Sequence, residues 1–207
     1  MNKDLLRKLT EAVGVTAFKL FKNERFRKLI FFDSITQLEQ DRIFNELVLA
    51  VLTVIMLTCD APDIPEENKV FFQKIKDDLP KMYISQLRSM SIENKYLKQW
   101  ITLINMRYQE YTDDKVKARE AAMIVESQDK DIDIKKLSEI QLMLPLQTVA
   151  IGCHHHICRG KTDGRDDLFK MIIRWLGEFY VEFRVIVEGK EISVLTRIKV
   201  GIRRLFR

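Results

Sequence analysis

The densest apolar run in the chain extends from Glu46 to Asp60 and has the sequence ELVLAVLTVIMLTCD. Between Leu47 and Leu57 only Thr53 interrupts the hydrophobic residues, so a helix in this segment is apolar on every face. Such a helix is buried inside a protein or a membrane. Because a transmembrane helix needs roughly 20 apolar residues, this run is too short to span a bilayer. The pattern therefore predicts a buried helix at the centre of a soluble helical bundle.

Outside this run, apolar residues recur at three-to-four spacing, which is typical of amphipathic helices. Capping residues and the onset of this spacing place helix starts at residue 3, Asn23, Ser34, Pro65, Ser91, Ile134 and Asp166. Proline removes a helix hydrogen bond, so Pro80 is expected to break the helix after Leu79. For the same reason, Pro145 is expected to interrupt or kink a later helix.

Two segments fit more than one structure. The helix over 91–111 ends there or continues to Gln128, and the pattern does not decide between these lengths. Residues 181–200 contain enough β-branched residues for a hairpin. We favour two helices with Gly189 as the cap between them, because the three-to-four period continues unbroken from Leu168.

The last segment, 190–207, is predicted to be a basic amphipathic tail. As a helix it places four apolar residues on one stripe, namely Leu195, Ile198, Ile202 and Leu205. Its cations line the remainder and are Arg197, Lys199, Arg203, Arg204 and Arg207. This composition is typical of a helix that lies in an anionic membrane interface. The competing interpretation, which we favour slightly, is that the stripe packs on the bundle and its charges face the acidic body.

The composition is that of an ordinary folded chain. Of its 207 residues, 46% are hydrophobic and 31% are charged, which is sufficient for a sizeable core. Only seven Gly and four Pro are present, and this scarcity of breakers favours long helices. Because a domain typically contains roughly 150 residues, a chain of this length is expected to form one domain. We therefore predict an all-α, single-domain bundle over 1–207, with about eight to nine helices around the buried one.

The net charge of +5 is unevenly distributed along the chain. Residues 1–30 carry +5, residues 184–207 carry +5, and residues 31–183 carry −5. This asymmetry indicates an anionic partner, such as an anionic membrane surface, or docking of the ends on the body. Nucleic acid is a disfavoured partner because the body is acidic and no recognition helix is evident. Three cysteines, an odd number, and the absence of a signal peptide indicate a reducing cytoplasm.

Two acidic segments each follow an apolar helix and precede an amphipathic one. Their carboxylates are candidate metal ligands: Asp60, Asp63, Glu66 and Glu67 in the first, and Asp163, Asp166 and Asp167 in the second. Clustered carboxylates in a tight turn suit Ca²⁺ or Mg²⁺, and a single shared site requires Asp60 to lie close to Asp163. Carboxylates also gather at helix N-termini because of the helix dipole. Neither segment has EF-hand spacing, so we favour this simpler interpretation.

The first segment resembles a known family unit. LAVLTVIMLTCD followed by IPEENKVFFQKI is similar to the helix–acidic turn–helix unit of the TerB-type tellurite-resistance family. TDGRDDLFKMIIRWLG is similar to the second copy of that unit. The resemblance implies an all-helical fold, an acidic metal site and a role in the stress response near the membrane.

All three histidines and two of the three cysteines lie in one six-residue segment, CHHHIC, from Cys153 to Cys158. On a helix, Cys153 and Ile157 face the core. His154 and Cys158 then form an i, i+4 pair on one flank, and His156 lies on the other. These are candidate Zn²⁺ ligands, but zinc takes three or four, so the rest would come from elsewhere in the chain. An ordinary polar helix face is the simpler interpretation, and we favour it.

Together these patterns predict a non-enzymatic, cytoplasmic helical protein. We expect it to act through a divalent metal ion (Ca²⁺, Mg²⁺ or Zn²⁺), an anionic membrane surface or a protein partner. The alternative is a helical metalloenzyme with ligands from Asp60, Glu66, Asp163 and the histidine segment. The sequence indicates neither the specific ligand nor the oligomeric state.

Overall fold

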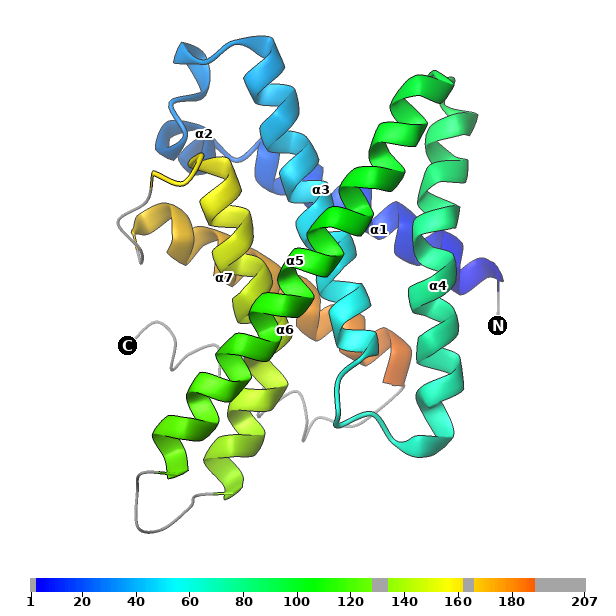
Figure 1. Ribbon diagram of the computed structural model, residues 1–207. Coiled ribbons are helices and arrows are strands. Elements are labelled where there is room, and N and C mark those ends of the chain that lie inside the picture. The colour runs from blue at the N-terminus through cyan, green and yellow to red at the C-terminus, as the bar shows by residue number, and fades with distance from the viewer. Residues whose placement is uncertain (1–2, 128–133, 162–165, 189–207) are drawn as a thin grey trace.

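The computed structural model describes residues 3–127, 134–161 and 166–188 (Figure 1). Its helices are α1 (Lys3–Phe21), α2 (Glu24–Leu29), α3 (Gln37–Cys59), α4 (Glu66–Ser89), α5 (Asn94–Ser127), α6 (Ile134–Ile157) and α7 (Asp167–Glu188), with a short 3₁₀ turn, η1 (Phe32–Ser34). No strand occurs in these ranges, so the all-α prediction is confirmed. The described ranges hold seven α-helices, and the predicted tail, 190–207, lies outside them.

Helix α3 begins later than the capping pattern at Ser34 predicts. Its cap is Thr36, whose Oγ1 accepts a hydrogen bond from the Glu39 backbone N–H at 3.3 Å. Ser34 instead ends the 3₁₀ turn. The chain offers two capping patterns in succession, and Thr36 has the extended backbone that an N-cap requires. The start expected for this helix was therefore wrong by two residues.

The second half of α3 is buried from Leu47 to Cys59. Val48, Val51 and Ile55 are each 0% exposed, which confirms the burial that their apolar surroundings predict. Helices α1, α4, α5, α6 and α7 all contact α3. By length and composition, α3 is the one helix among the described residues that could cross a membrane, and 83% of its apolar window is buried by the rest of the protein.

Two helices continue through proline. Helix α4 runs from Glu66 to Ser89 with Pro80 inside it, so the break expected after Leu79 is wrong. Helix α6 likewise continues through Pro145 without interruption. Leu79 and Tyr83 are buried on either side of Pro80, and this packing offsets the lost backbone hydrogen bond. The long form of α5 is the observed one, because this helix extends past 111 to Ser127.

Helices α4 and α5 are consecutive in the chain and form a hairpin whose two arms diverge (Figure 1). These two helices are close together at the hairpin that joins them and diverge away from it. The C-terminal end of α3 lies between their diverging parts and contacts both helices. On the opposite side of α3, helix α6 packs against α3, α5 and α7. The histidine segment lies in this second region, whereas Asp60 and two open hollows lie in the first.

Candidate functional site

Asp60 joins three helices at the end of α3. Its Oδ1 accepts a hydrogen bond from Lys76 Nζ of α4 at 2.7 Å, and its Oδ2 accepts one from the Tyr108 hydroxyl of α5 at 2.5 Å. Burial raises the pKa of Tyr108, and the hydrogen bond to Asp60 raises it further. Both carboxylate oxygens of this predicted metal ligand therefore already have a partner within the protein.

The other carboxylates of the first acidic segment are divided between an ion pair with a buried arginine and the exposed first turn of α4. Asp63 Oδ2 lies 2.6 Å from Nη2 of the buried Arg184 in α7. Glu66 Oε2 pairs with Lys69 Nζ at 2.5 Å on the exposed first turn of α4. Glu67 is also exposed in that turn, where carboxylates favour the positive end of the helix dipole.

The second acidic segment caps α7 and contacts α6. Asp166 accepts a hydrogen bond from a backbone N–H in the first turn of α7 at 2.7 Å, and its carboxylate lies 3.1 Å from His154 Nε2. Asp167 pairs with Arg25 of α2 at 3.3 Å. Asp163 lies outside the described residues. The structure thus brings two predicted ligands, His154 and Asp166, into contact.

The two acidic segments lie at opposite ends of α7. Asp63 binds Arg184 near the C-terminal end of this helix, whereas Asp167 begins it. Seventeen residues separate Asp167 from Arg184, which corresponds to about 26 Å along a helix. Asp60 is close to Asp63 in the chain, and Asp166 adjoins Asp167. The described carboxylates of the two segments therefore do not form the single site that the metal hypothesis requires.

The histidine segment forms the last turns of α6. Cys153 and Ile157 are buried, as the helical pattern predicts. The expectation that His154 lies on an exposed polar face is wrong. Its side chain is only 3% exposed, and its ring packs edge-on against an aromatic ring of α7. His156 Nε2 lies 2.8 Å from Glu110 Oε1 of α5. Each of these two histidines therefore joins α6 to another helix through a carboxylate.

Burial keeps the three thiols in their protonated form. It raises the pKa of Cys59 to about 12 and the pKa of Cys153 well above its usual range. Burial also raises the pKa of the half-buried Cys158, with a further increase from the nearby Asp166 carboxylate. The thiolate is the form that acts as a nucleophile or metal ligand. These environments are those of structural thiols.

No group of three or more His, Cys, Asp or Glu side chains is placed to hold a metal ion within the ranges 3–127, 134–161 and 166–188. The contact between His154 and Asp166 supplies two such side chains. The metal sites remain a prediction, because Asp163, a candidate ligand in the acidic set and in the metalloenzyme alternative, is not described.

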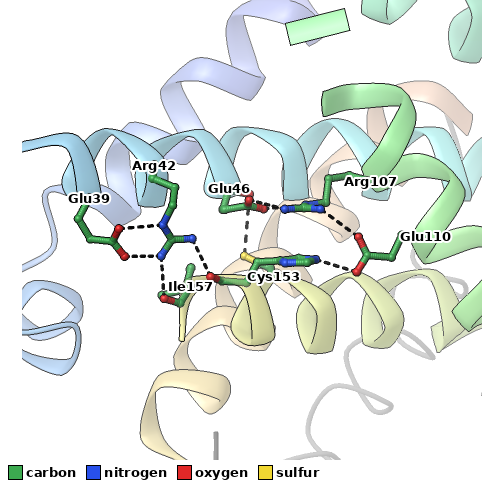
Figure 2. A network of polar contacts seen from close by, with 8 residues as sticks. Glu39, Arg42, Glu46, Arg107, Glu110, Cys153 and Ile157 are labelled. Atoms are coloured by element: carbon green, nitrogen blue, oxygen red, sulfur yellow. Dashed lines mark hydrogen bonds and ion pairs between the residues drawn. The ribbon is translucent and has the colours of Figure 1, made fainter. Parts of the chain in front are cut away.

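A buried polar network joins α3, α5 and α6 (Figure 2). Arg107 of α5 binds Glu46 of α3 with two hydrogen bonds, at 2.7 and 3.0 Å. The same guanidinium donates to Glu110 at 3.1 Å, and Glu110 in turn lies 2.8 Å from His156. Cys153 makes a weak contact with the Glu46 carbonyl oxygen at 4.0 Å. The network thus runs unbroken from α3 through α5 to α6.

A second branch of the network caps the end of α6 (Figure 2). Arg42 of α3 donates to the carbonyl oxygens of His156 at 2.7 Å and Ile157 at 3.0 Å. Glu39 holds the Arg42 guanidinium through two hydrogen bonds and also binds Arg159. The last carbonyl groups of a helix lack intrahelical partners, and cations are favoured there. Arg42 therefore fixes α6 on α3.

Sequence reasoning missed this network because its partners are far apart in the chain. Sixty-one residues separate Glu46 from Arg107, and neither belongs to a recognisable motif. One signal was present: Glu46 immediately precedes the all-apolar run, and a charged residue on such a helix needs a partner. The sequence could have indicated that Glu46 is paired, although it could not have identified Arg107.

Two adjoining hollows follow α4 on the side away from the network. One, of about 830 Å³, lies between the segment 59–64 and the first half of α4. The other, of about 540 Å³, lies between α4 and residues 101–108 of α5, with Met56 of α3 also lining it. They share Asp77 and Lys81, so they form one trough along α4 from Lys69 to Arg88, which we call the α4 groove.

Comparisons with protein families, with curated proteins and with solved structures found no match to this chain. The resemblance to the TerB-type family therefore remains a prediction from the sequence segments that carry it.

Proposed function

We propose that this is a non-enzymatic binding protein that acts on a protein partner, and that the partner docks in the α4 groove. One observation carries this proposal: apolar side chains line the groove and remain exposed. Ile101 is 47% exposed on the α5 side, and Val70 is 82% exposed on the α4 side. Apolar surface that lines a concave region is typical of an interaction site.

The shape of the groove favours a polypeptide over a small molecule. Nineteen residues separate Lys69 from Arg88, which corresponds to about 29 Å along α4. Small-molecule sites enclose most of their ligand, whereas this trough is long, with α4 on one side and the segment 59–64 and α5 on the other. A groove of this kind suits a helix that lays its apolar face between two others.

The environments of the carboxylates, histidines and thiols support a binding function over a catalytic one. The buried carboxylates and histidines described above hold helices together, and burial keeps the thiols protonated. Enzyme sites usually place such groups in a cleft. In this protein, the residues of the polar network do not line the α4 groove, and Asp60, which does, is held by Lys76 and Tyr108.

Site-specific photocrosslinking in cells tests this proposal. A photoreactive amino acid at Ser85 or at Ile101, on opposite sides of the groove, should give adducts with the same protein. The matched control is Thr102, which is exposed on α5 but does not line the groove. The Ser85 adduct should be lost when Ile101→Asp is added. Equal adducts at Thr102, or no adduct from either side of the groove, would show that the proposal is wrong.

A further inference from the structure

Two of the cations that line the α4 groove form no ion pair within the described ranges. Lys69, Lys76 and Lys81 pair with Glu66, Asp60 and Asp78, respectively. Lys74 and Arg88 also line the groove and are exposed, and neither forms an ion pair with any residue in the described ranges. Fourteen residues separate them, which is close to four helical turns, or about 21 Å.

Between these two cations, apolar residues of α4 and α5 line the groove together with polar ones. Pro80 and Ile84 follow one another at i, i+4 on α4, and Ile101 and Ile104 at i, i+3 on α5. Rows with these spacings are the ridges that pack against a neighbouring helix. Ile84 and Ile104 are buried, so the exposed Ile101 and the partly exposed Pro80 present the apolar surface that the stripe of a third helix would cover. Asp77 is the exposed acidic residue shared by the two hollows. Within the described ranges, its carboxylate accepts a hydrogen bond from the side-chain amide of Gln73 at 2.9 Å and forms no ion pair.

We infer that the α4 groove binds an amphipathic helix of a protein partner that carries acidic residues about four turns apart, on either side of an apolar stripe. This inference rests on the proposed function and specifies the chemistry of the partner. One carboxylate pairs with Lys74 and the other with Arg88, while the stripe covers Pro80 and Ile101. A basic residue midway along the helix would meet Asp77. The pairing of the partner's two carboxylates with Lys74 and Arg88 fixes the position of the partner helix along the groove and the selectivity for this partner.

Peptide binding to the full-length chain tests this inference. Three fluorescent helical peptides share one apolar stripe and differ only at the two terminal positions, which are Glu, Gln or Lys. Fluorescence anisotropy should show that the Glu peptide binds at least about tenfold more tightly than the Lys peptide, with a difference that shrinks as salt rises. Equal affinities for the three peptides, or binding by none of them, would overturn the inference.

Charge reversal makes the test specific to the groove. The double variant Lys74→Glu/Arg88→Glu should prefer the Lys peptide over the Glu peptide. The matched control Lys28→Glu/Lys117→Glu changes the net charge equally at exposed positions outside the groove, and it should keep the original preference. If both double variants lose the preference equally, the effect comes from net charge and the inference is wrong.

The outcomes separate this inference from the proposed function. Adducts at Ser85 and Ile101 without a preference for the Glu peptide would leave the function standing and overturn the acidic partner. Absence of both adducts and peptide binding would overturn both. Binding to phosphatidylserine vesicles that Lys74→Glu/Arg88→Glu abolishes would overturn the acidic helix in favour of an anionic membrane surface. Self-association in ultracentrifugation that Ile101→Asp abolishes would overturn it in favour of a second copy of this chain.

Discussion

The polar network and the α4 groove use charge in opposite ways. In the network, Arg107 and Arg42 bind residues of other helices and are largely removed from water. Along the groove, Lys69 and Lys81 pair with residues three positions away on the same exposed helix. The first kind of pair fixes how helices pack, whereas the second contributes little to stability. Charge therefore organises the fold throughout the network, whereas along the groove Lys76 joins helices through Asp60 and the more exposed cations remain available for a partner.

The same contrast applies to the apolar residues. Around the network, the close approach of α5 and α6 leaves no room for a side chain at Gly152, because a Cβ there would lie 2.1 Å from Tyr111 Cε1. Along the groove, α4 and α5 diverge and leave Ile101 half exposed. A tightly packed region resists substitution, whereas an open one tolerates it. Substitutions on the two sides should therefore separate effects on stability from effects on binding.

The largest expected effect is in the network. Glu46→Ala leaves the Arg107 guanidinium buried without its main partner, which should lower the free energy of unfolding by about 3–5 kcal/mol. The double variant Glu46→Leu/Arg107→Met removes both charges and should recover much of this loss. Urea denaturation of the three proteins measures the difference. A single variant as stable as the wild type would show that the network does not fix the helices.

A smaller loss is expected where α5 and α6 touch. Gly152→Ala places a methyl group against the Tyr111 ring, so the helices must separate, at a cost of about 1–3 kcal/mol. Gly14→Ala is the matched control, since no atom lies within 4 Å of the position of its Cβ. It should be neutral or slightly stabilising because alanine favours a helix. Thermal unfolding of both variants checks this contrast, and equal changes in Tm would contradict it.

The all-α fold could be predicted from the sequence because helical periodicity is a local property. The buried run of α3, the Asn23 cap of α2 and the start of α7 after Asp166 all depend on residues within a few positions of one another. The continuation of α4 through Pro80 could not be predicted. It depends on packing of Leu79 and Tyr83 against other helices, and that packing overrides the local preference of proline.

The candidate sites were harder to predict because they depend on pairs distant in sequence. The sequence indicated that His154 and Asp166 are chemically notable, and the structure places them in contact. It gave no indication that Glu110 reaches His156, or that Arg42 caps α6. The α4 groove was also missed, since a hollow arises from the divergence of two helices and leaves no pattern in either one.

The pH dependence of stability should report on the second branch of the network. Hydrogen bonds from Arg159, and then from Arg42, lower the pKa of Glu39 from 4.5 to about 2 in the folded protein. A lowered folded-state pKa stabilises the protein above pH 4.5, and this stabilisation is lost as the pH falls toward 2.

Glu39→Gln tests this pH dependence. The variant should be less stable than the wild type by about 1 kcal/mol at pH 6, since Arg159 is exposed and its contribution is screened. The difference should shrink to near zero at pH 2. Chemical denaturation at several pH values measures it, with Glu67→Gln as the control for removal of an exposed carboxylate. A constant difference across the pH range would mean that Glu39 does not act through its charge.

The smallest effect on stability, and the sharpest test of the comparison, is expected at the groove. Ile101→Asp changes a half-exposed residue and should lower the free energy of unfolding by less than about 1 kcal/mol. Met106→Asp is the matched control, because Met106 is 54% exposed on the same helix but does not line the groove. The two variants should therefore unfold alike, while only Ile101→Asp weakens binding of the acidic peptide. If both variants bind the peptide as the wild type does, Ile101 is ordinary surface, and the contrast between a structural side and a binding side of α3 fails at its central residue.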